Sequence, residues 1–202
     1  MSIEGINRAG KTTQSNLLCR ILRNQGYPVR LFKFPNYETK VGELIRNTLY
    51  KHRDMNSRLL SALFSANRLE SRDDILKCLS SGEVAVSDRY ADSEYAYGVA
   101  QGLPRQWLLA LESQMPCADL VILLDMDPSL ALTRIGPDKK SDIFEENPGL
   151  LSRVRQCYLD LANKPPRPGQ RWEIIDAKQD TGTVHEIVVA KVLEVLSDTI
   201  AS

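Results

Sequence analysis

The chain has little histidine and no excess of either charge. Its 202 residues include only two histidines, His52 and His185, which argues against a histidine-based metal site or catalytic triad. The 26 basic and 26 acidic side chains cancel, whereas nucleic-acid grooves and membrane-binding surfaces usually need a basic excess. We therefore expect no nucleic-acid partner and no membrane partner, and any anion site must be local.

The chain also lacks paired cysteines and long apolar runs. Its four cysteines, Cys19, Cys78, Cys117 and Cys157, are too far apart for a zinc site or a redox dithiol, so we expect reduced interior thiols. No apolar run approaches the ~20 residues of a membrane span, and too few residues precede the first glycine motif for a signal peptide. We expect a cytoplasmic protein with one domain over residues 1–202, because this length buries one good core.

What the chain does contain is an alternation of strand and helix patterns. Strands are predicted at 29–34, 83–88, 119–127 and 171–176, and helices after the first glycine motif and at about 57–79, 92–100, 104–114 and 183–196. Unbroken apolar strands are typical of parallel sheets covered on both faces. The alternation predicts a three-layer α/β fold with right-handed crossovers. The polar segment 134–149, broken by prolines and glycines, predicts a mobile loop between two helices.

The most informative motif is Gly5-Ile6-Asn7-Arg8-Ala9-Gly10-Lys11-Thr12, which fits the phosphate-binding pattern G-x-x-x-x-G-K-[ST]. Its glycines let backbone N–H groups wrap a phosphate, and the following helix presents its positive end. Lys11 then reaches the β- and γ-phosphates of a nucleotide, and Thr12 can hold Mg²⁺. The motif alone leaves GTPases, ATPases and small-molecule kinases open. The sequence has no D-x-x-G switch and no N-K-x-D guanine motif, which argues against a GTPase.

Two further stretches, FSANRLE at 64–70 and DRYADSEYAY at 88–97, make the chain resemble the thymidylate kinase family from Glu4 to the final helix. The arginine inside the phosphate loop makes the resemblance closest to the eukaryotic and poxviral branch. The resemblance implies a P-loop NTPase fold with a five-stranded parallel sheet flanked by helices, a mobile lid at about 136–147, and usually a homodimer. It implies transfer of the γ-phosphoryl group of ATP to dTMP, which gives dTDP and ADP, with Mg²⁺ as cofactor.

The resemblance also implies roles for individual residues. Arg8, Lys11 and Arg89 would be the catalytic cations, and Thr12 and Asp88 would hold Mg²⁺. The expected ATP-binding residues are Gly5, Asn7, Arg8, Ala9, Gly10, Lys11, Thr12, Thr13, Arg134, Ala177 and Lys178. The expected dTMP-binding residues are Asn7, Phe34, Pro35, Tyr37, Phe64, Arg68, Arg89, Ser93, Tyr97 and Phe144.

Chemistry gives the arginine inside the loop a purpose. A nucleoside monophosphate has a second pKa of about 6 and is largely dianionic at neutral pH, so it needs no general base. The barrier is the approach of two anions, which cations must offset. Arg8 would then act as an arginine finger supplied from the same chain. At the other end of the substrate, the resemblance implies that Phe64 stacks on thymine and that Arg68 hydrogen-bonds its O4. The spacing agrees with this, because residues four apart share a helix face.

Several positions depart from the family pattern, and three of them lie in the expected dTMP site. Asn7 replaces an aspartate that accepts a hydrogen bond from the sugar 3′-hydroxyl, and a neutral bond is worth about 1 kcal/mol less, so weaker dTMP binding is expected. Tyr37 replaces a phosphate-binding arginine, whose charge Lys33 or Lys40 could supply. Phe144 matches a lid tyrosine that selects deoxyribose, and its ring keeps the steric exclusion. These departures leave open a kinase with another pyrimidine preference, such as dUMP, or an inactive nucleotide-binding paralogue.

Overall fold

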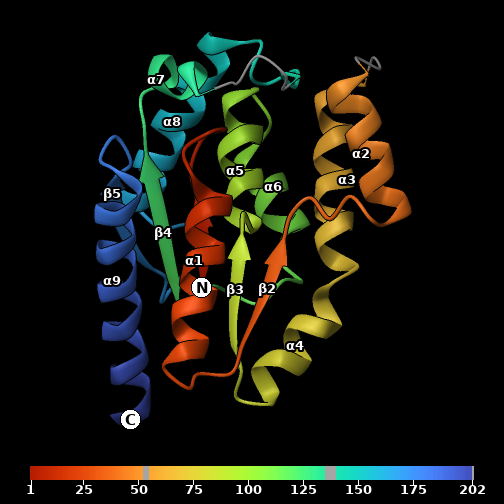
Figure 1. The fold of residues 1–202 in the computed structure, drawn as a ribbon. Helices are drawn as coiled ribbons and strands as arrows, with labels where there is room; N and C mark the ends of the chain where they lie inside the picture. Colours follow the sequence, from red (N-terminus) through yellow and green to blue (C-terminus); the bar gives the residue numbers. More distant parts are fainter. Residues whose placement is uncertain (52–54, 135–139, 202) are drawn as a thin grey trace.

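A five-stranded parallel sheet runs through the middle of the molecule (Figure 1). The computed structural model describes residues 1–51, 55–134 and 140–201, with side chains up to residue 198. The strands are β1 Ser2–Glu4, β2 Val29–Lys33, β3 Val84–Asp88, β4 Leu120–Asp125 and β5 Arg171–Asp176. Their order is β2-β3-β1-β4-β5, and every pair is parallel. The predicted five-stranded parallel sheet is confirmed.

Helices cover both faces of this sheet, which gives the predicted three layers (Figure 1). α1 and α9 pack together on one face, and α5 and α8 pack together on the other. In the described part of the chain the helices are α1 Lys11–Asn24, α2 Lys40–Tyr50, α3 Ser57–Leu69, α4 Arg72–Ser80, α5 Ala91–Ala100, α6 Arg105–Leu111, α7 Pro128–Thr133, α8 Pro148–Asn163 and α9 Thr181–Ala201. None of these helices is both long and apolar enough to cross a bilayer.

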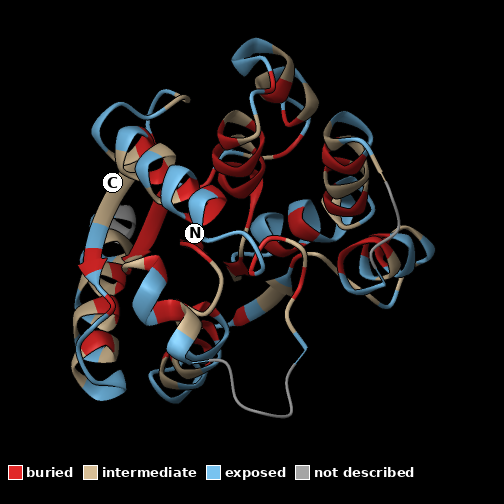
Figure 2. Cartoon of the chain, turned by 90° about the horizontal axis from the view of Figure 1, so that it is seen from above, coloured by how far each residue is buried: buried red, intermediate tan, exposed pale blue. Residues whose placement is uncertain are grey.

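The core lies between the sheet and these helices. In β4, residues Leu120 to Leu124 are at most 2% exposed, as expected for a strand covered on both faces. Figure 2 shows the buried residues in the strands and on the inward sides of the helices. Because all five strands run the same way, their carboxyl ends meet at one edge, and β1 has β3 on one side and β4 on the other. The order of the strands reverses there, which is where open α/β sheets bind ligands.

The single helix predicted at 57–79 was wrong in one respect, because it is two helices. α3 ends at Leu69, and α4 begins at Arg72 after a turn. Ser71 is the N-cap position of α4, and Asp73 and Asp74 lie in its first turn. The side chain of Ser71 makes no capping hydrogen bond, but carboxylates favour the positive end of a helix, so a new helix start competes with continuation there. α2 was not predicted; its N-cap Thr39 accepts a hydrogen bond from Gly42.

Two other predictions need correction or are only partly described. Cys19 and Cys78 are buried free thiols as expected, but Cys117 is exposed and Cys157 is half-buried. Cys117 follows Pro116 on the connection between α6 and β4, outside the packed layers. Of the expected lid at 136–147, residues 136–139 lie outside the described residues. The rest, from Lys140, forms turns that lead to Asn147, the N-cap of α8.

Candidate active site

The phosphate loop joins β1 to α1 at the carboxyl edge of the sheet. Gly5 and Gly10 have φ angles of 138° and 100°, a region that glycine enters readily and other residues do not. A Cβ atom on Gly5 would lie 2.6 Å from the carbonyl oxygen of Leu124. Only glycine therefore lets the loop pass this close to β4. The loop then turns into α1, whose first N–H groups are available to an anion.

Two arginines of this edge have left-handed backbones. Arg8 in the loop has φ 63°, and Arg89, directly after β3, has φ 64°. Such a conformation costs a non-glycine residue about 1 kcal/mol or more, and it is found mainly where function requires it. Both residues line the same cavity. The fold thus accepts strain at the two positions that bring guanidinium groups to the carboxyl ends of β1 and β3.

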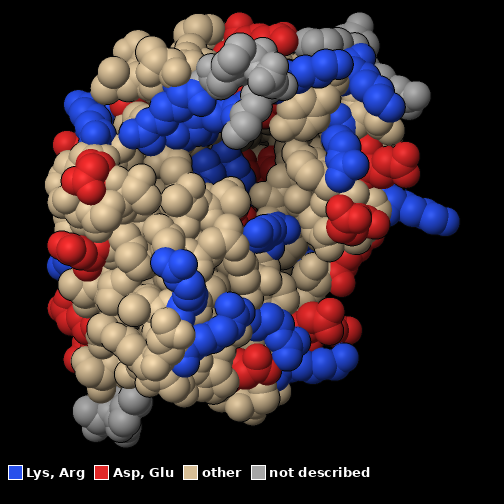
Figure 3. Space-filling view, in the orientation of Figure 1, with Lys and Arg blue, Asp and Glu red and all other residues tan. Residues whose placement is uncertain are grey.

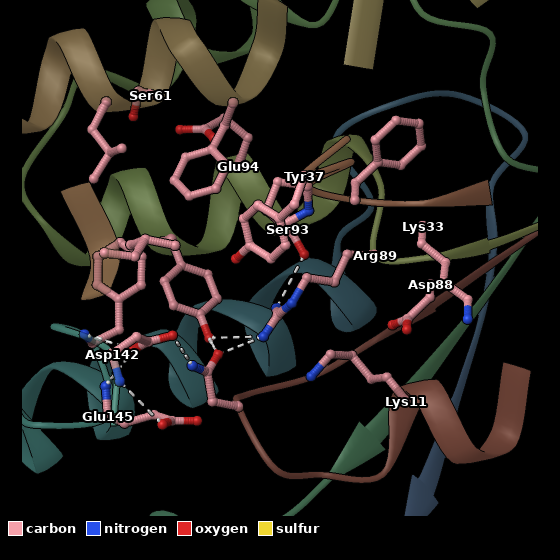
Figure 4. A pocket seen from close by; sticks show the side chains of 18 of the residues that line it. Lys11, Lys33, Tyr37, Ser61, Asp88, Arg89, Ser93, Glu94, Asp142 and Glu145 are labelled. Atoms are coloured by element: carbon pink, nitrogen blue, oxygen red, sulfur yellow. Dashed lines mark hydrogen bonds between the residues drawn. The ribbon is translucent and has the colours of Figure 1, made fainter. Parts of the chain in front are cut away.

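Hydrogen bonds fix the guanidinium of Arg89 against the phosphate loop. Its Nη1 donates to the carbonyl oxygen of Gly5 at 3.1 Å, and its Nη2 donates to Oδ1 of Asn7 at 2.5 Å. The hydroxyl of Tyr97 donates to the same Asn7 oxygen at 2.8 Å. Figure 4 shows Arg89 between this loop and Ser93 of α5. Protein groups therefore fix the position and direction of this cation.

A buried glutamate at the end of β1 supports the turn that carries Arg89. Glu4 is fully buried. Its carboxylate accepts hydrogen bonds from the N–H of Tyr90 at 2.7 Å and from the hydroxyls of Ser93 and Tyr158 at 2.6 and 2.9 Å. Burial, and to a smaller extent the nearby Asp92, raise the pKa of Glu4 to about 7. These donors satisfy the carboxylate and tie β1, β3 and α8 together beneath the site.

Lys11, Thr12 and Asp88 meet between the loop and β3. The hydroxyl of Thr12 donates to Oδ2 of Asp88 at 2.5 Å, and Nζ of Lys11 donates to the carbonyl oxygen of Ile6 at 2.6 Å. Burial, and to a smaller extent the neighbouring Arg89, lower the pKa of Lys11 to about 7. A hydroxyl beside a carboxylate fits Mg²⁺, which binds few protein oxygens and takes its other ligands from phosphates and water. The described residues hold no cluster of three or more His, Cys, Asp or Glu suited to a metal ion.

Two cavities lie on either side of the phosphate loop. The first has a volume of about 390 Å³ and the second about 370 Å³. Arg8, Lys11 and Thr12 line both, so the loop and the start of α1 form the wall between them. Figure 3 shows Lys and Arg side chains around a hollow near the carboxyl edge of the sheet, although the chain as a whole is neutral. Positive charge is thus concentrated locally, as the sequence required of any anion site.

The residues expected to bind dTMP are brought together in the first cavity, which is lined by Asn7, Phe34, Pro35, Tyr37, Phe64, Arg68, Arg89, Ser93, Tyr97 and Phe144. Most of the residues expected to bind ATP line the second cavity, namely Arg8, Ala9, Gly10, Lys11, Thr12, Thr13, Arg134 and Ala177. Nη2 of Arg134 also donates to the carbonyl oxygen of Ala177 at 3.0 Å. Gly5, Asn7 and Lys178 do not line the second cavity.

Arg68 lies in a buried ionic cluster at the far end of the first cavity. Its Nη2 donates to Glu112 at 2.5 Å and to Glu94 at 3.3 Å, and all three side chains are at most 4% exposed. Glu94 lines the cavity with Arg68, whereas Glu112 does not. Burial raises the pKa of Glu94 to about 7. The cavity therefore ends in a fixed cation beside a carboxyl group that titrates near neutral pH.

The segment before α8 contributes two carboxylates that the sequence analysis missed. Glu145 accepts a bidentate pair from Arg8, with Nε at 2.7 Å and Nη2 at 3.0 Å. Asp142 accepts a hydrogen bond from Nδ2 of Asn7 at 2.8 Å. Figure 4 shows both carboxylates at the same end of the cavity. These pairs join residues more than 130 positions apart, so no local pattern pointed to them.

Aromatic rings line the rest of this wall, and one lysine faces it. The ring of Phe144 packs on Tyr97 with centroids 5.1 Å apart. The guanidinium of Arg46 lies over the ring of Tyr37, 4.9 Å from its centroid. Lys33 lines the first cavity, whereas Lys40 does not. Of the two candidates for the missing arginine charge, Lys33 is therefore the better placed.

Comparison with known proteins gives a consistent result. The family model described as thymidylate kinase matches residues 3–188. A probable thymidylate kinase of Thermococcus kodakarensis is 36% identical over 97% of this chain and 98% of its own. The thymidylate kinase of Schizosaccharomyces pombe is 33% identical over 93% and 88%, and that of Dictyostelium discoideum is 39% identical over 87% and 76%.

The raised pKa of Glu94 predicts how stability depends on pH. The folded pKa is about 7, against 4.5 for an ordinary glutamate side chain, so the folded state binds the proton more tightly than the unfolded state does. The stabilisation is complete below the unfolded pKa and is lost as pH rises through about 7. Chemical denaturation should show that the free energy of unfolding of wild type falls as pH rises from about 5 to 8. In Glu94→Gln this fall should be smaller by up to about 3 kcal/mol.

Glu38 supplies the control for this measurement, because its side chain is 90% exposed. Glu38→Gln should keep the wild-type pH dependence of the free energy of unfolding. Equal slopes in wild type and Glu94→Gln would mean that Glu94 does not titrate in this range.

Proposed function

The chain belongs to the thymidylate kinase family, and we propose that its first cavity binds dTMP and its second binds ATP. It is an ATP-dependent nucleoside monophosphate kinase that transfers the γ-phosphoryl group to dTMP and so forms dTDP and ADP, a step toward dTTP. One observation carries the assignment of the two sites: Arg8, Lys11 and Thr12 line both cavities. A phosphoryl group that crosses from one cavity to the other would remain beside the same cations.

In the first cavity, the acceptor phosphate would lie at Arg89 and the base at Phe64. Arg89 is held by the phosphate loop, so it is oriented before the substrate arrives. Phe64 and Arg68 line the far end, one helical turn apart on α3. A ring there can stack on thymine and a guanidinium can donate to O4. Ser93 and Tyr97 would line the space between phosphate and base.

In the second cavity, the triphosphate of ATP would follow the loop and the start of α1. Residues Ala9 to Thr13 line this cavity, where backbone N–H groups and the helix end favour anions. Arg134 and Ala177 lie at the other end of it and would border the adenine. Gly5, Asn7 and Lys178 lie outside it, so Gly5 is assigned to loop geometry and Asn7 to the acceptor side.

We infer that Mg²⁺ binds at Thr12 and Asp88 together with the phosphates. The paired hydroxyl and carboxylate are the hard oxygen ligands that this ion prefers. When bound, Mg²⁺ supplies charge neutralisation at the phosphate oxygens.

The residues of this chain would lower the barrier by placing cations and excluding water. The dTMP phosphate is already a nucleophile near neutral pH, so no residue has to remove a proton from it. Lys11 would neutralise the donor, Arg89 would orient the acceptor, and Arg8 would exchange Glu145 for the migrating phosphoryl group. The segment that carries Phe144 and Glu145 would close over the cavity and keep water out.

Three broader features remain proposals. One continuous sheet through the described residues supports a single domain over 1–202. The four free thiols support a reducing, cytoplasmic location. The family resemblance supports a homodimer. The alternatives left open by the sequence, a kinase with another pyrimidine preference and an inactive paralogue, gain no support.

An acceptor panel tests the function directly. ADP release would be measured with ATP, Mg²⁺ and each of dTMP, dUMP, UMP, dCMP and GMP. We expect dTMP to be the best acceptor, and UMP to fall below dUMP in kcat/KM by about 10-fold or more, because the ring of Phe144 excludes a 2′-hydroxyl. No turnover with dTMP, or a better acceptor than dTMP, would refute the function. Comparable turnover of UMP and dUMP would refute the role of Phe144.

A substitution in the loop tests the role of Arg8. Arg8→Ala should lower kcat by about 10³-fold, since it removes a cation that acts mainly in the transition state. The KM for ATP should change by less than about 10-fold. Arg20→Ala is the matched control, because Arg20 is exposed on α1 and lines neither cavity; its kcat should equal that of wild type. A loss of activity in Arg8→Ala that lies entirely in the KM for ATP would contradict this role.

A further inference from the structure

Asp142 presents a buried carboxylate to the first cavity. The residue is only 6% exposed and lines the cavity wall. Its Oδ1 accepts from the N–H groups of Phe144 and Glu145, each at 2.9 Å, which fixes the direction of the side chain. Its Oδ2 accepts from Nδ2 of Asn7 at 2.8 Å. A carboxylate has about four acceptor positions, so three donors leave one for a ligand.

The side-chain oxygen of Asn7, by contrast, is already in use. Its Oδ1 accepts from Nη2 of Arg89 at 2.5 Å and from the hydroxyl of Tyr97 at 2.8 Å. An amide oxygen has two lone pairs, and these two donors occupy both. Its amide nitrogen is a donor and points to Asp142. Of these two side chains, only Asp142 can therefore accept a further hydrogen bond.

The position of the carboxylate limits which ligand group it can meet. It lies next to Asn7, the partner of Arg89 at the proposed phosphate site. It also lies two residues before Phe144, whose ring packs on Tyr97 in the same wall. With the phosphate of dTMP at Arg89 and its base at Phe64, the sugar between them would lie along this wall. That sugar has one free hydroxyl, at the 3′ carbon, so a carboxylate that accepts from it must accept there.

Resting on the proposed binding of dTMP in the first cavity, we propose that Asp142 accepts the hydrogen bond of the 3′-hydroxyl and that Asn7 is the positioning residue for this carboxylate. The charge that the phosphate loop lacks at position 7 is thus supplied by the segment before α8. This replaces the expectation that Asn7 weakens dTMP binding, which took Asn7 itself as the acceptor. Acceptor binding then also draws on the segment that would close over the cavity.

The proposal explains why an amide suits position 7. An aspartate there would set two carboxylates where the amide nitrogen and Oδ2 are now 2.8 Å apart, and like charges at that distance cannot both stay ionised. Exchanging the two residues has a different outcome. In Asn7→Asp/Asp142→Asn, an amide at 142 can donate to a carboxylate at 7, so the hydrogen bond re-forms in the opposite direction and the net charge is unchanged.

The experiment compares dTMP with 3′-deoxy-dTMP as acceptors for wild type, Asp142→Asn, Asn7→Asp and the exchanged double variant. Wild type should have a KM for 3′-deoxy-dTMP at least about 10-fold above that for dTMP, since a hydrogen bond to a charged acceptor is lost. Asp142→Asn should raise the KM for dTMP about 10-fold and change that for 3′-deoxy-dTMP by less than about twofold. Asn7→Asp alone should also raise the KM for dTMP, and the double variant should return it to within about threefold of wild type.

Glu146→Gln is the matched control. Glu146 is an exposed acid in the same segment and does not line the cavity, so both KM values should stay at wild type. A rise in both KM values of Asp142→Asn by the same factor would overturn the proposal, because a merely structural role affects both acceptors equally. A lower KM for dTMP in Asn7→Asp alone would also overturn it.

Two features keep the test decisive. Where thermal unfolding shows that Asp142→Asn does not fold, a crystal structure of wild type with dTMP decides: a 3′-oxygen within hydrogen-bond distance of the Asp142 carboxylate supports the proposal, and a 3′-oxygen held by another acceptor contradicts it. No ADP release from wild type with dTMP would refute the proposed function itself. Wild type that turns over both acceptors with equal KM would refute only the role of Asp142.

Discussion

Positive charge must be held in a partly closed crevice before any phosphate arrives, and much of this structure follows from that constraint. Arg8, Lys11, Arg68 and Arg89 all line the first cavity. An uncompensated buried charge costs several kcal/mol, so each cation needs a partner within the protein. Arg8 has Glu145, Arg68 has Glu94 and Glu112, and Arg89 and Lys11 have carbonyl oxygens. The neutral chain therefore concentrates cations at the site and holds each of them with a partner from the protein.

The fold supplies these pairs through the geometry of a parallel sheet. The carboxyl ends of β1 and β3 deliver the phosphate loop and Arg89 to one edge, and the buried Glu4 ties the two strand ends together. The left-handed backbones of Arg8 and Arg89 are the strain that this arrangement requires. Partners then arrive from distant parts of the chain, because Glu94 comes from α5 and Glu145 from the segment before α8. Pre-placed cations reduce the reorganisation that catalysis would otherwise require.

The features that could be predicted from the sequence are those determined by neighbouring residues along the chain. The phosphate loop and the strands at 29–34, 83–88 and 171–176 followed from glycine placement and apolar runs, and the parallel sheet followed from their alternation. The prediction of one helix at 57–79 was wrong because the start of a new helix near Ser71 lay inside an apolar repeat that favoured a continuous helix. Cys117 was placed inside because cysteine usually is, although Pro116 and Cys117 belong to a connection. Asp142 and Glu145 could not be predicted, because their partners lie at the other end of the chain.

The exchange of Glu145 for the transferred phosphoryl group at Arg8 can be tested in a crystal structure with dTMP, Mg²⁺ and a non-hydrolysable ATP analogue. In that structure the guanidinium of Arg8 should lie within hydrogen-bond distance of the γ-phosphate oxygens and should no longer form its bidentate pair with Glu145. A structure in which both substrates are bound, Arg8 remains paired with Glu145 and no arginine contacts the γ-phosphate would contradict it.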